Sequence, residues 1–380
     1  MDAVSGVDAL LLADPQLAAF AAEVDAVVDA WDGPPLQYFR GRGGAARELY
    51  RELGRRDMLA VSWPTELGGG GRPLTYEYTL WNQLAYRRAT RPEIGATIVA
   101  RVLMRHGTEE QKTLLLPAIR RGEVCFALGY SEPEAGSDLG AVRTRATRHG
   151  DAYVVEGEKV WTSEAHHAEH LWCLCRTGAQ DEHGRALTLL IIDTQTPGLT
   201  VRPIPTIDGH HVNQVLLDGV EVPAAARVGE EGQAWAIVRE GLAAERHLQF
   251  MPGRVRRDLE DLVALCRRTG ALARSDVQQR LAELAAGVAA AEASAAANLV
   301  EAASGAISPV SAACTKVLGS TLAQDVAAAA FDLCGTAALD EAGVSELLWR
   351  QTRMETVAGG STEMLLGIVA RGALQLRPST

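Results

Sequence analysis

The spacing of hydrophobic residues divides the chain into three regions. Residues 1–120 show apolar positions at helical spacing, interrupted by glycine and proline. Residues 121–225 instead carry short alternating or fully apolar runs bounded by Gly, Asp and Pro, which is typical of strands. Alanine-rich helical spacing returns in residues 226–380. The pattern predicts a mainly helical α+β chain with an N-terminal helical domain, a middle β domain and a C-terminal helical bundle.

Length and charge narrow the class of protein. The 380 residues exceed what one hydrophobic core usually serves, which favours several packed domains. A net charge of -11 argues against nucleic-acid binding, which needs clustered Lys and Arg. The N-terminal stretch lacks a basic segment followed by an apolar run, and no window of about 18 uninterrupted apolar residues occurs. We therefore expect a cytoplasmic protein with no membrane span and no nucleic-acid partner.

Cysteine and histidine are the residues that could form disulfides or bind a metal. The six cysteines show no Cys-x-x-Cys spacing, and Cys173 and Cys175 alternate within a strand-like run, so we interpret all six as reduced thiols. His166, His167 and His170 resemble zinc-ligand spacing, but no carboxylate or thiolate supports them in helical register. We therefore expect no metal site.

A pair of glycines interrupts the helical pattern near the C-terminus, in the stretch RMETVAGGSTEM of residues 353–364. Each glycine costs roughly 1 kcal/mol relative to alanine inside a helix. The pair therefore indicates a turn, a close approach of the backbone or a ligand.

Five segments occur in a distinctive order along the chain: WPTELGGGG, HGTEEQKTLLLPAIRRGE, SEPEAGSDL, KVWTS and NQVLLDGVEVP. Together they closely resemble the corresponding segments of the acyl-CoA dehydrogenase family, and SEPEAGSDL and KVWTS are the specific parts. The resemblance implies that family's fold, in which the middle domain is a β-barrel or sandwich and the C-terminal domain is a four-helix bundle. It also implies FAD as cofactor.

The resemblance assigns the flavin contacts to the middle domain. It places Trp161 along the isoalloxazine ring and the Ser163 hydroxyl near its reactive nitrogen, and strand alternation puts both side chains on one face. It matches Tyr130 and Ser131 to positions that contact the ring, and Ser137 to one beside the thioester of the substrate. A core role for Trp161 and a plain turn role for Ser137 are the alternatives.

The resemblance implies oxidation of an acyl thioester to its trans-2-enoyl form, with a carboxylate as base and FAD as hydride acceptor. Many family members carry that base in a Glu-Gly-Thr-x-Glu segment, but here Gly359 occupies its position and Glu363 matches the second glutamate. A subset carries the base within Leu-x-x-Glu-Arg, which Glu245 and Arg246 match. Glu245 is therefore the expected base, with Arg246 as an orienting partner. A purely structural Glu-Arg pair, or Glu240 as base, stays open.

The glycine pair keeps a role in the resemblance even without the glutamate. In the family, a main-chain N–H at the position of Gly359 polarises the thioester carbonyl together with a flavin hydroxyl, an arrangement that needs no side chain. We expect the loop around Gly359 and Gly360 to close over the acyl thioester, with glycine allowing close main-chain approach.

The chain departs from the family where a neighbouring subunit usually contacts the flavin. The segment CRRTGALARSDV lacks the phenylalanine of an Arg-x-x-Phe-Gly motif, so that Arg267 or Arg268 would supply the positive charge alone. The segment FDLCGTAAL lacks the glutamine of a Gln-x-x-Gly-Gly motif. The contacts that a second subunit would make to the flavin are therefore the part of the expected site that this sequence matches least.

These inferences predict an acyl thioester dehydrogenase that acts on acyl-CoA or an acyl-carrier-protein substrate. By resemblance, electrons pass to an electron-transfer flavoprotein, and the chain forms a homodimer or homotetramer, with a heteromer as a further assembly. Two alternatives remain: a flavin-dependent monooxygenase or oxidase on the same fold, and a non-catalytic partner subunit of a heteromeric dehydrogenase.

Overall fold

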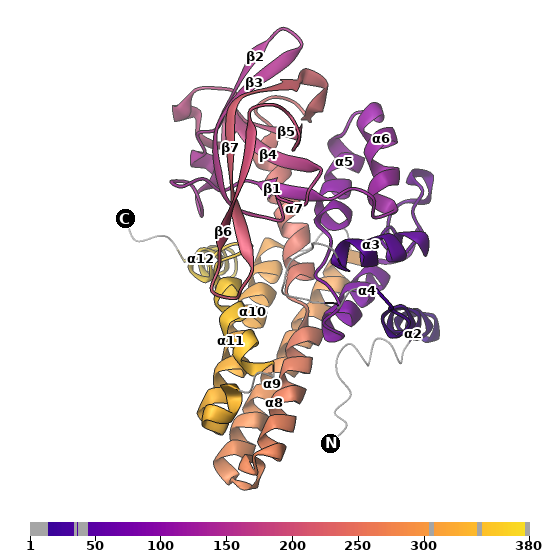
Figure 1. The fold of residues 1–380 in the computed structure, drawn as a ribbon, viewed down its shortest axis with the longest axis vertical. Helices are drawn as coiled ribbons and strands as arrows, with labels where there is room; N and C mark the ends of the chain where they lie inside the picture. Colours follow the sequence, from indigo (N-terminus) through magenta and orange to yellow (C-terminus); the bar gives the residue numbers. More distant parts are fainter. Residues whose placement is uncertain (1–13, 34–35, 37–44, 304–307, 340–343, 377–380) are drawn as a thin grey trace. The chain divides into compact units, whose positions relative to one another are not determined.

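The structure is a computed structural model that describes residues 14–33, 36, 45–303, 308–339 and 344–376 (Figure 1). The chain forms two compact units, and each is built from stretches far apart in the sequence. We call them the bundle unit, made of Met1–Asp32, Arg72–Arg91 and Glu245–Thr380, and the sheet unit, made of Gly33–Gly71 and Pro92–Ala244.

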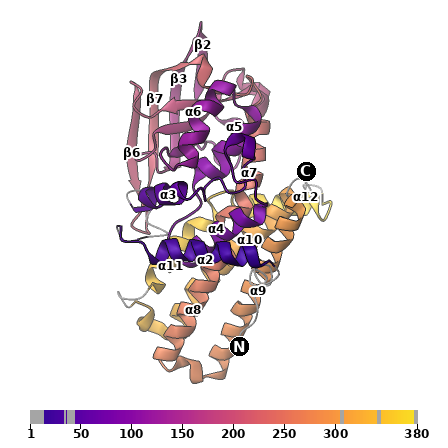
Figure 2. The same cartoon turned by 90° about the vertical axis from the view of Figure 1, so that its right-hand side faces the viewer.

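The sheet unit contains eight described strands that form one sheet in the order β6-β7-β3-β2-β4-β5-β8, with β1 paired to β4. Strands β6, β7 and β3 lie side by side (Figure 2). All pairings are antiparallel except those of β4 with β1 and β2. The bounds are β1 Phe126–Gly129, β2 Arg145–His149, β3 Ala152–Ser163, β4 His170–Arg176, β5 Leu187–Asp193, β6 Leu199–Pro205, β7 His211–Pro223 and β8 Arg227–Val228.

Alternating apolar side chains of these strands form the core of the sheet unit, including Tyr153, Val155, Leu171 and Val220. The register between β3 and β7 shifts between Val155 and Gly157, where the extra residue is in β7, and β3 itself bulges between Lys159 and Thr162. Such a bulge adds one residue to a strand and re-aims the side chains beyond it. The bulge in β3 falls within KVWTS.

Helices and short helical turns complete the sheet unit. Helix α6 begins at a capping box, in which Thr108 and Gln111 satisfy each other's backbone N–H groups. The amide of Gln111 also donates to the carbonyls of Ala225 and Arg227 at 2.8 and 2.9 Å, which ties α6 to the end of the sheet. The bounds are α3 Ala45–Arg55, η1 Thr65–Leu67, η2 Gly95–Val99, α5 Ala100–His106, α6 Glu109–Arg120, η3 Leu139–Ala141, η4 Gln180–Ala186 and η5 Ala224–Ala226.

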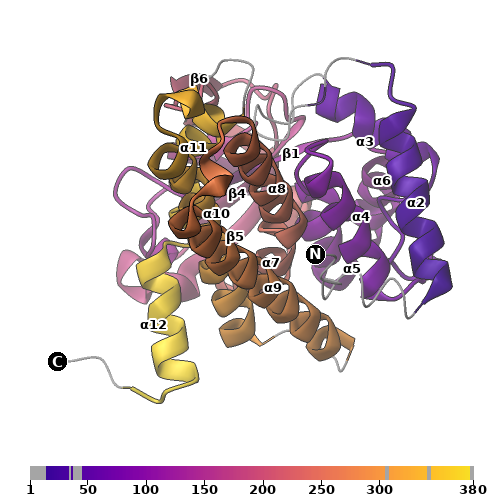
Figure 3. The same cartoon turned by 90° about the horizontal axis from the view of Figure 1, so that it is seen from below.

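The bundle unit is helical, and its central helix α10 packs against α8, α9, α11 and α12 (Figures 1 and 3). Alanine and leucine side chains from α8, α9 and α10 form its core. The bounds are α2 Pro15–Asp29, α4 Leu74–Tyr86, α8 Pro252–Arg268, η6 Ala271–Ala273, α9 Ser275–Ala303, α10 Pro309–Cys334, η7 Gly335–Leu339, α11 Ser345–Thr352, η8 Arg353–Thr356 and α12 Thr362–Gly372. Helix α7, Ala234–Gln249, begins in the sheet unit and ends in the bundle unit.

The stretch Pro309–Leu339 is long and apolar enough to cross a membrane by length and composition alone. Within the bundle unit it serves as the central packing helix, and it carries the buried charged residue Lys316. The predicted fold class, with helical N-terminal, sheet-forming middle and helical C-terminal regions, is confirmed. The compact units regroup these regions, because α2 and α4 pack with the C-terminal helices.

Candidate flavin and substrate site

A buried ion pair joins the two most specific segments of the sheet unit. Lys159 in KVWTS is 0% exposed, and its ammonium donates to the Glu132 carboxylate of SEPEAGSDL at 2.7 Å. It also donates to the carbonyls of Leu174 and Tyr130, at 2.6 and 3.3 Å. The loop that begins at Tyr130 is therefore fixed to β3.

Glu132 organises the rest of that loop. Its carboxylate accepts from the backbone N–H groups of Arg143 and Thr144, at 2.6 and 2.9 Å, and its own backbone forms a tight turn with Ala135. Burial raises the pKa of this carboxyl, but the Lys159 ammonium and these hydrogen bonds outweigh burial and hold the pKa below its usual range. Glu132 is therefore an anion at neutral pH.

The bulge in β3 presents the predicted flavin residues. Trp161 is 62% exposed and has a φ of 59°, in the left-handed region that tryptophan rarely adopts. Thr162 is buried, whereas Ser163 is partly exposed, so Trp161 and Ser163 flank a residue that points inward. An indole held out on strained backbone offers a flat apolar face to a ligand.

The remaining predicted residues of the sheet unit lie in the loop after β1. The Val160 N–H donates to the Ser131 carbonyl at 2.9 Å, so the structure brings Tyr130 and Ser131 next to the bulge. Tyr130 is buried, Ser131 is half-buried and Ser137 is exposed. These residues fit a planar cofactor that lies against Trp161 with polar contacts at one edge.

In the bundle unit, the predicted glycine loop links η8 to α12. Gly359 has a φ of 68° and Gly360 a φ of 104°, which explains why glycine occupies both positions. A Cβ on Gly360 would also approach the Met364 Cε to 2.7 Å. Ser361 caps α12 by accepting from the Met364 N–H, and Glu363 is exposed in its first turn.

A second buried lysine holds this loop. Lys316 on α10 is 0% exposed, and its ammonium donates to the Gly360 carbonyl at 2.8 Å and lies 5.2 Å from the centre of the Phe250 ring. Just before the loop, the Arg254 guanidinium of α8 donates to the buried Glu355 carboxylate at 2.6 Å. Burial raises the pKa of Glu355, and Arg254 opposes that shift. Both contacts fix the path of the backbone around Gly359.

The predicted base lies on α7. The backbone of Glu245 and Arg246 is helical, but their side chains lie outside the part of the chain that the structure describes. The alternative base, Glu240, is 42% exposed and forms an ion pair with Arg105. Arg267 and Arg268 are exposed at the end of α8.

A histidine cluster follows the bulge directly. Glu164, His166 and His167 offer ligand atoms that all lie within 4.8 Å of one another, a carboxylate contribution that the sequence reasoning missed. Burial lowers the pKa of His166 to about 4, and His167 adds to this, so the ring is neutral at pH 7. Its Nδ1 lies 3.1 Å from the Asn213 amide nitrogen, which can donate to it. The expectation that no metal binds here stays a prediction.

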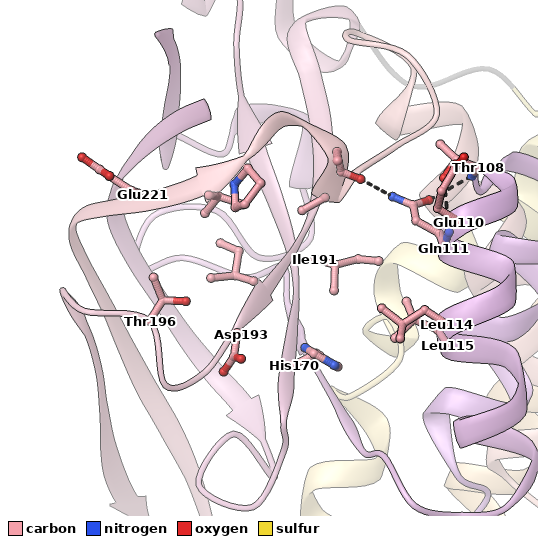
Figure 4. A pocket seen from close by; sticks show the side chains of 15 residues that line it. Thr108, Glu110, Gln111, Leu114, Leu115, His170, Ile191, Asp193, Thr196 and Glu221 are labelled. Carbon is pink, nitrogen blue, oxygen red and sulfur yellow. Dashed lines mark hydrogen bonds between the residues drawn. The ribbon is translucent and has the colours of Figure 1, made fainter. Parts of the chain in front are cut away.

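A separate apolar cavity of about 450 Å³ lies between α6 and the sheet (Figure 4). Leu114, Leu115 and Ile191 form part of its wall, and His170 also lines it (Figure 4). The predicted flavin and substrate residues are not among its lining residues.

These features define a chain with the fold of a flavin-dependent dehydrogenase. Its three parts match the acyl-CoA dehydrogenase N-terminal domain over residues 14–123, the middle domain over residues 127–220 and the C-terminal domain over residues 232–374. The chain belongs to the acyl-CoA dehydrogenase family, whose members are flavin-dependent oxidoreductases that act on CH–CH groups.

Individual relatives support this assignment. The acyl-CoA dehydrogenase FadE29 of Mycobacterium tuberculosis is 39% identical over 213 residues, which are 56% of this chain, and the chain spans about half of the FadE29 length (55%). The structure of the Tcur3481-Tcur3483 steroid ACAD is 31% identical, with a TM-score of 0.90 over 96% of this chain and 99% of that one. The ChsE4-ChsE5 complex of M. tuberculosis is 30% identical, with a TM-score of 0.86 over the same shares.

Proposed function

We propose that the chain is an FAD-dependent dehydrogenase that converts an acyl thioester to its trans-2-enoyl thioester. The observation that carries the proposal is the exposed Trp161 on left-handed backbone, beside Ser163 and next to a loop fixed by the Lys159–Glu132 pair. A strained, exposed aromatic residue is expected where a bound ligand covers it. When bound, FAD accepts the hydride that leaves the β carbon.

The chain's own residues would hold the cofactor and substrate. The Trp161 indole would pack on the flavin ring, the Ser163 hydroxyl and the Tyr130–Ser131 segment would contact its polar edge, and Ser137 would lie beside the thioester. The positive φ of Gly359 and Gly360 allows their main chain to approach the thioester carbonyl closely. A main-chain N–H donated to that oxygen stabilises negative charge as the α proton leaves.

Glu245 is the proposed base that takes the α proton, with Arg246 orienting it. Both residues lie on helix α7 within the Leu-x-x-Glu-Arg match. The acyl group is carried by coenzyme A or an acyl carrier protein, an electron-transfer flavoprotein receives the electrons, and the protein acts in the cytoplasm.

The chain is proposed to act as a dimer or dimer of dimers. Arg268 is exposed at the end of α8, where it can contribute charge to a flavin shared between subunits. Because the aromatic and glutamine residues of the shared motifs are absent from this sequence, a second, different subunit could supply the missing contacts. The similarity to the ChsE4-ChsE5 complex supports testing a heteromer alongside a homo-oligomer.

A non-catalytic partner subunit is the second candidate function, favoured by Gly359 at the position of the usual base. A monooxygenase or oxidase is the third, since it needs no carboxylate base. Anaerobic rapid mixing of the yellow protein with acyl thioesters distinguishes these functions.

The decisive variant in that assay is Glu245→Gln, which keeps the shape of the side chain and removes the base. We expect FAD and thioester to bind as in the parent, while flavin reduction slows by roughly 10²- to 10⁴-fold. Glu240→Gln is the matched control on the same helix and should reduce at the parent rate, because Glu240 pairs with Arg105. Equal rates for Glu245→Gln and the parent would exclude Glu245 as base. A colourless parent that gains FAD only with a partner chain would favour the second function.

A further inference from the structure

Two thiols from distant parts of the sequence lie in contact in the bundle unit. The Sγ atoms of Cys266, in the last turn of α8, and Cys334, the last residue of α10, are 3.6 Å apart. The two residues are 68 positions apart in the chain. A disulfide needs a sulfur separation of about 2.05 Å, so the two sulfurs would have to approach each other by roughly 1.5 Å.

The two thiols differ in their exposure to solvent. Cys266 is fully buried, whereas Cys334 is partly exposed and also accepts a hydrogen bond from the Thr269 hydroxyl at 3.7 Å. Burial raises the pKa of the Cys266 thiol to about 12, and contact with Cys334 adds to that rise. Cys334 is therefore the thiol that a soluble reagent meets first, and Cys266 is positioned to react second.

We propose that Cys266 and Cys334 form a site of reversible oxidation, which a low-molecular-weight disulfide converts to an intramolecular disulfide between the ends of α8 and α10. The Cys334 thiolate attacks one sulfur of the small disulfide and releases one small thiol. The Cys266 thiol then loses its proton and attacks the Cys334 sulfur of the mixed disulfide, which releases the second small thiol. The protein loses two electrons and two protons, and the small disulfide gains them.

The bond would connect two segments that the sequence already distinguishes. Cys266 directly precedes Arg267 and Arg268, and Cys334 lies in FDLCGTAAL. Oxidation would fix the spacing of these segments at one end of the bundle and close a long loop of chain, which stabilises a fold by restricting its unfolded state. The inference stands on the bundle unit alone and does not depend on the proposed activity.

The other cysteines provide a matched control. Cys314 lies on the same helix as Cys334 and is exposed, and no thiol contact involving it is found among the described residues. Cys173 and Cys175 are also 3.6 Å apart, but they are two residues apart in one buried strand. If solvent exposure alone controlled oxidation, Cys314 should react first. If contact between two thiols controls it, the disulfide should join Cys334 to Cys266.

The test uses the intact protein, fully reduced, freed of reductant and then incubated with glutathione disulfide. After denaturation and alkylation, intact mass should show that two of the six thiols are lost without retained glutathione. Tryptic digestion should yield peptide 258–267, which contains Cys266, linked to peptide 317–350, which contains Cys334. The oxidised protein should also melt several degrees higher than the reduced protein.

Two variants decide the outcome. Cys334→Ser should abolish both the linked peptides and the difference in melting temperature, whereas Cys314→Ser should leave both unchanged. The proposal is overturned if the parent keeps all six alkylatable thiols. It is also overturned if glutathione stays attached to Cys334 while Cys266 remains alkylatable, or if the linked pair involves a different cysteine.

Discussion

Replacing Lys159 with methionine tests the ion pair that joins SEPEAGSDL to KVWTS. The variant keeps the length and apolar stem of the side chain but removes an ammonium with three acceptors: the Glu132 carboxylate and the carbonyls of Tyr130 and Leu174. Glu132 would stay buried with only the backbone donors of Arg143 and Thr144. Removing one partner of a buried pair typically costs about 3–5 kcal/mol, because the other charge is left uncompensated.

That loss is a large share of the roughly 5–15 kcal/mol that stabilises a typical protein. The matched control is Lys112→Met, because Lys112 pairs with the Glu109 carboxylate, whose side chain is 83% exposed. Exposed pairs contribute about 0–1 kcal/mol, so this control should stay close to the parent. The double variant Lys159→Met/Glu132→Gln should recover part of the loss, since it removes the uncompensated carboxylate.

Urea unfolding at one protein concentration, followed by far-ultraviolet circular dichroism, measures these differences. Flavin titration adds a second readout, because loosening the loop at Tyr130 should weaken FAD binding in Lys159→Met and leave it unchanged in Lys112→Met. If Lys159→Met unfolds within about 1 kcal/mol of Lys112→Met, the ion pair does not have the energetic role assigned to it.

Three further predictions follow from the same structure. Trp161→Ala should weaken FAD binding by about 1–3 kcal/mol, measured by fluorescence titration. The urea midpoint should change little, because the Trp161 side chain is mostly exposed. An unchanged affinity for FAD would contradict the proposed contact between Trp161 and the flavin. Because the folded pKa of Glu132 lies below the ordinary value of a glutamate, its stabilising contribution should be present above that ordinary value and lost as the pH falls through the folded pKa. Glu132→Gln should flatten this acidic part of the urea-midpoint profile. Lys316→Met should slow thioester-dependent flavin reduction in rapid mixing, because the Gly360 carbonyl loses its hydrogen-bond donor. The FAD content of the variant should stay at the parent level. A rate equal to that of the parent would show that Lys316 does not position the loop.

The sequence predicted the succession of helical and strand regions because hydrophobic periodicity depends on which face of an element is buried. Strand β3 and helix α9 follow directly from such patterns. Periodicity carries no information about which distant segments pack together. The regrouping of α2 and α4 with the C-terminal helices therefore emerged only from the structure.

The local geometry of the candidate site was partly predictable. The alternation of Trp161 and Ser163 could be read from the sequence, but the bulge depends on the register with β7 and left no sequence signal. Glycine at positions 359 and 360 correctly indicated unusual backbone, and both have positive φ. The contact between Cys266 and Cys334 joins the ends of two helices and could not be inferred from spacing.

The rarity of lysine in this sequence could have indicated the buried Lys159–Glu132 ion pair. The sequence contains three lysines, at positions 112, 159 and 316, and arginine supplies all its other permanent side-chain cations. In β3, Lys159 falls on the same alternation as Tyr153 and Val155, the apolar face of the strand. A lysine there must pair with an anion or with carbonyls, because a buried ammonium is costly otherwise. Glu132, in the neighbouring motif, was the natural partner to propose.

The two buried lysines have a similar task in separate units. Lys159 fixes the loop at Tyr130 in the sheet unit, and Lys316 fixes the Gly360 carbonyl in the bundle unit. In each case a compact ammonium reaches backbone oxygens that arginine's wider planar group would fit poorly in a closed space. The Lys316 contact is made to the main chain, so it fixes the loop through the Gly360 carbonyl and involves no side chain of the loop.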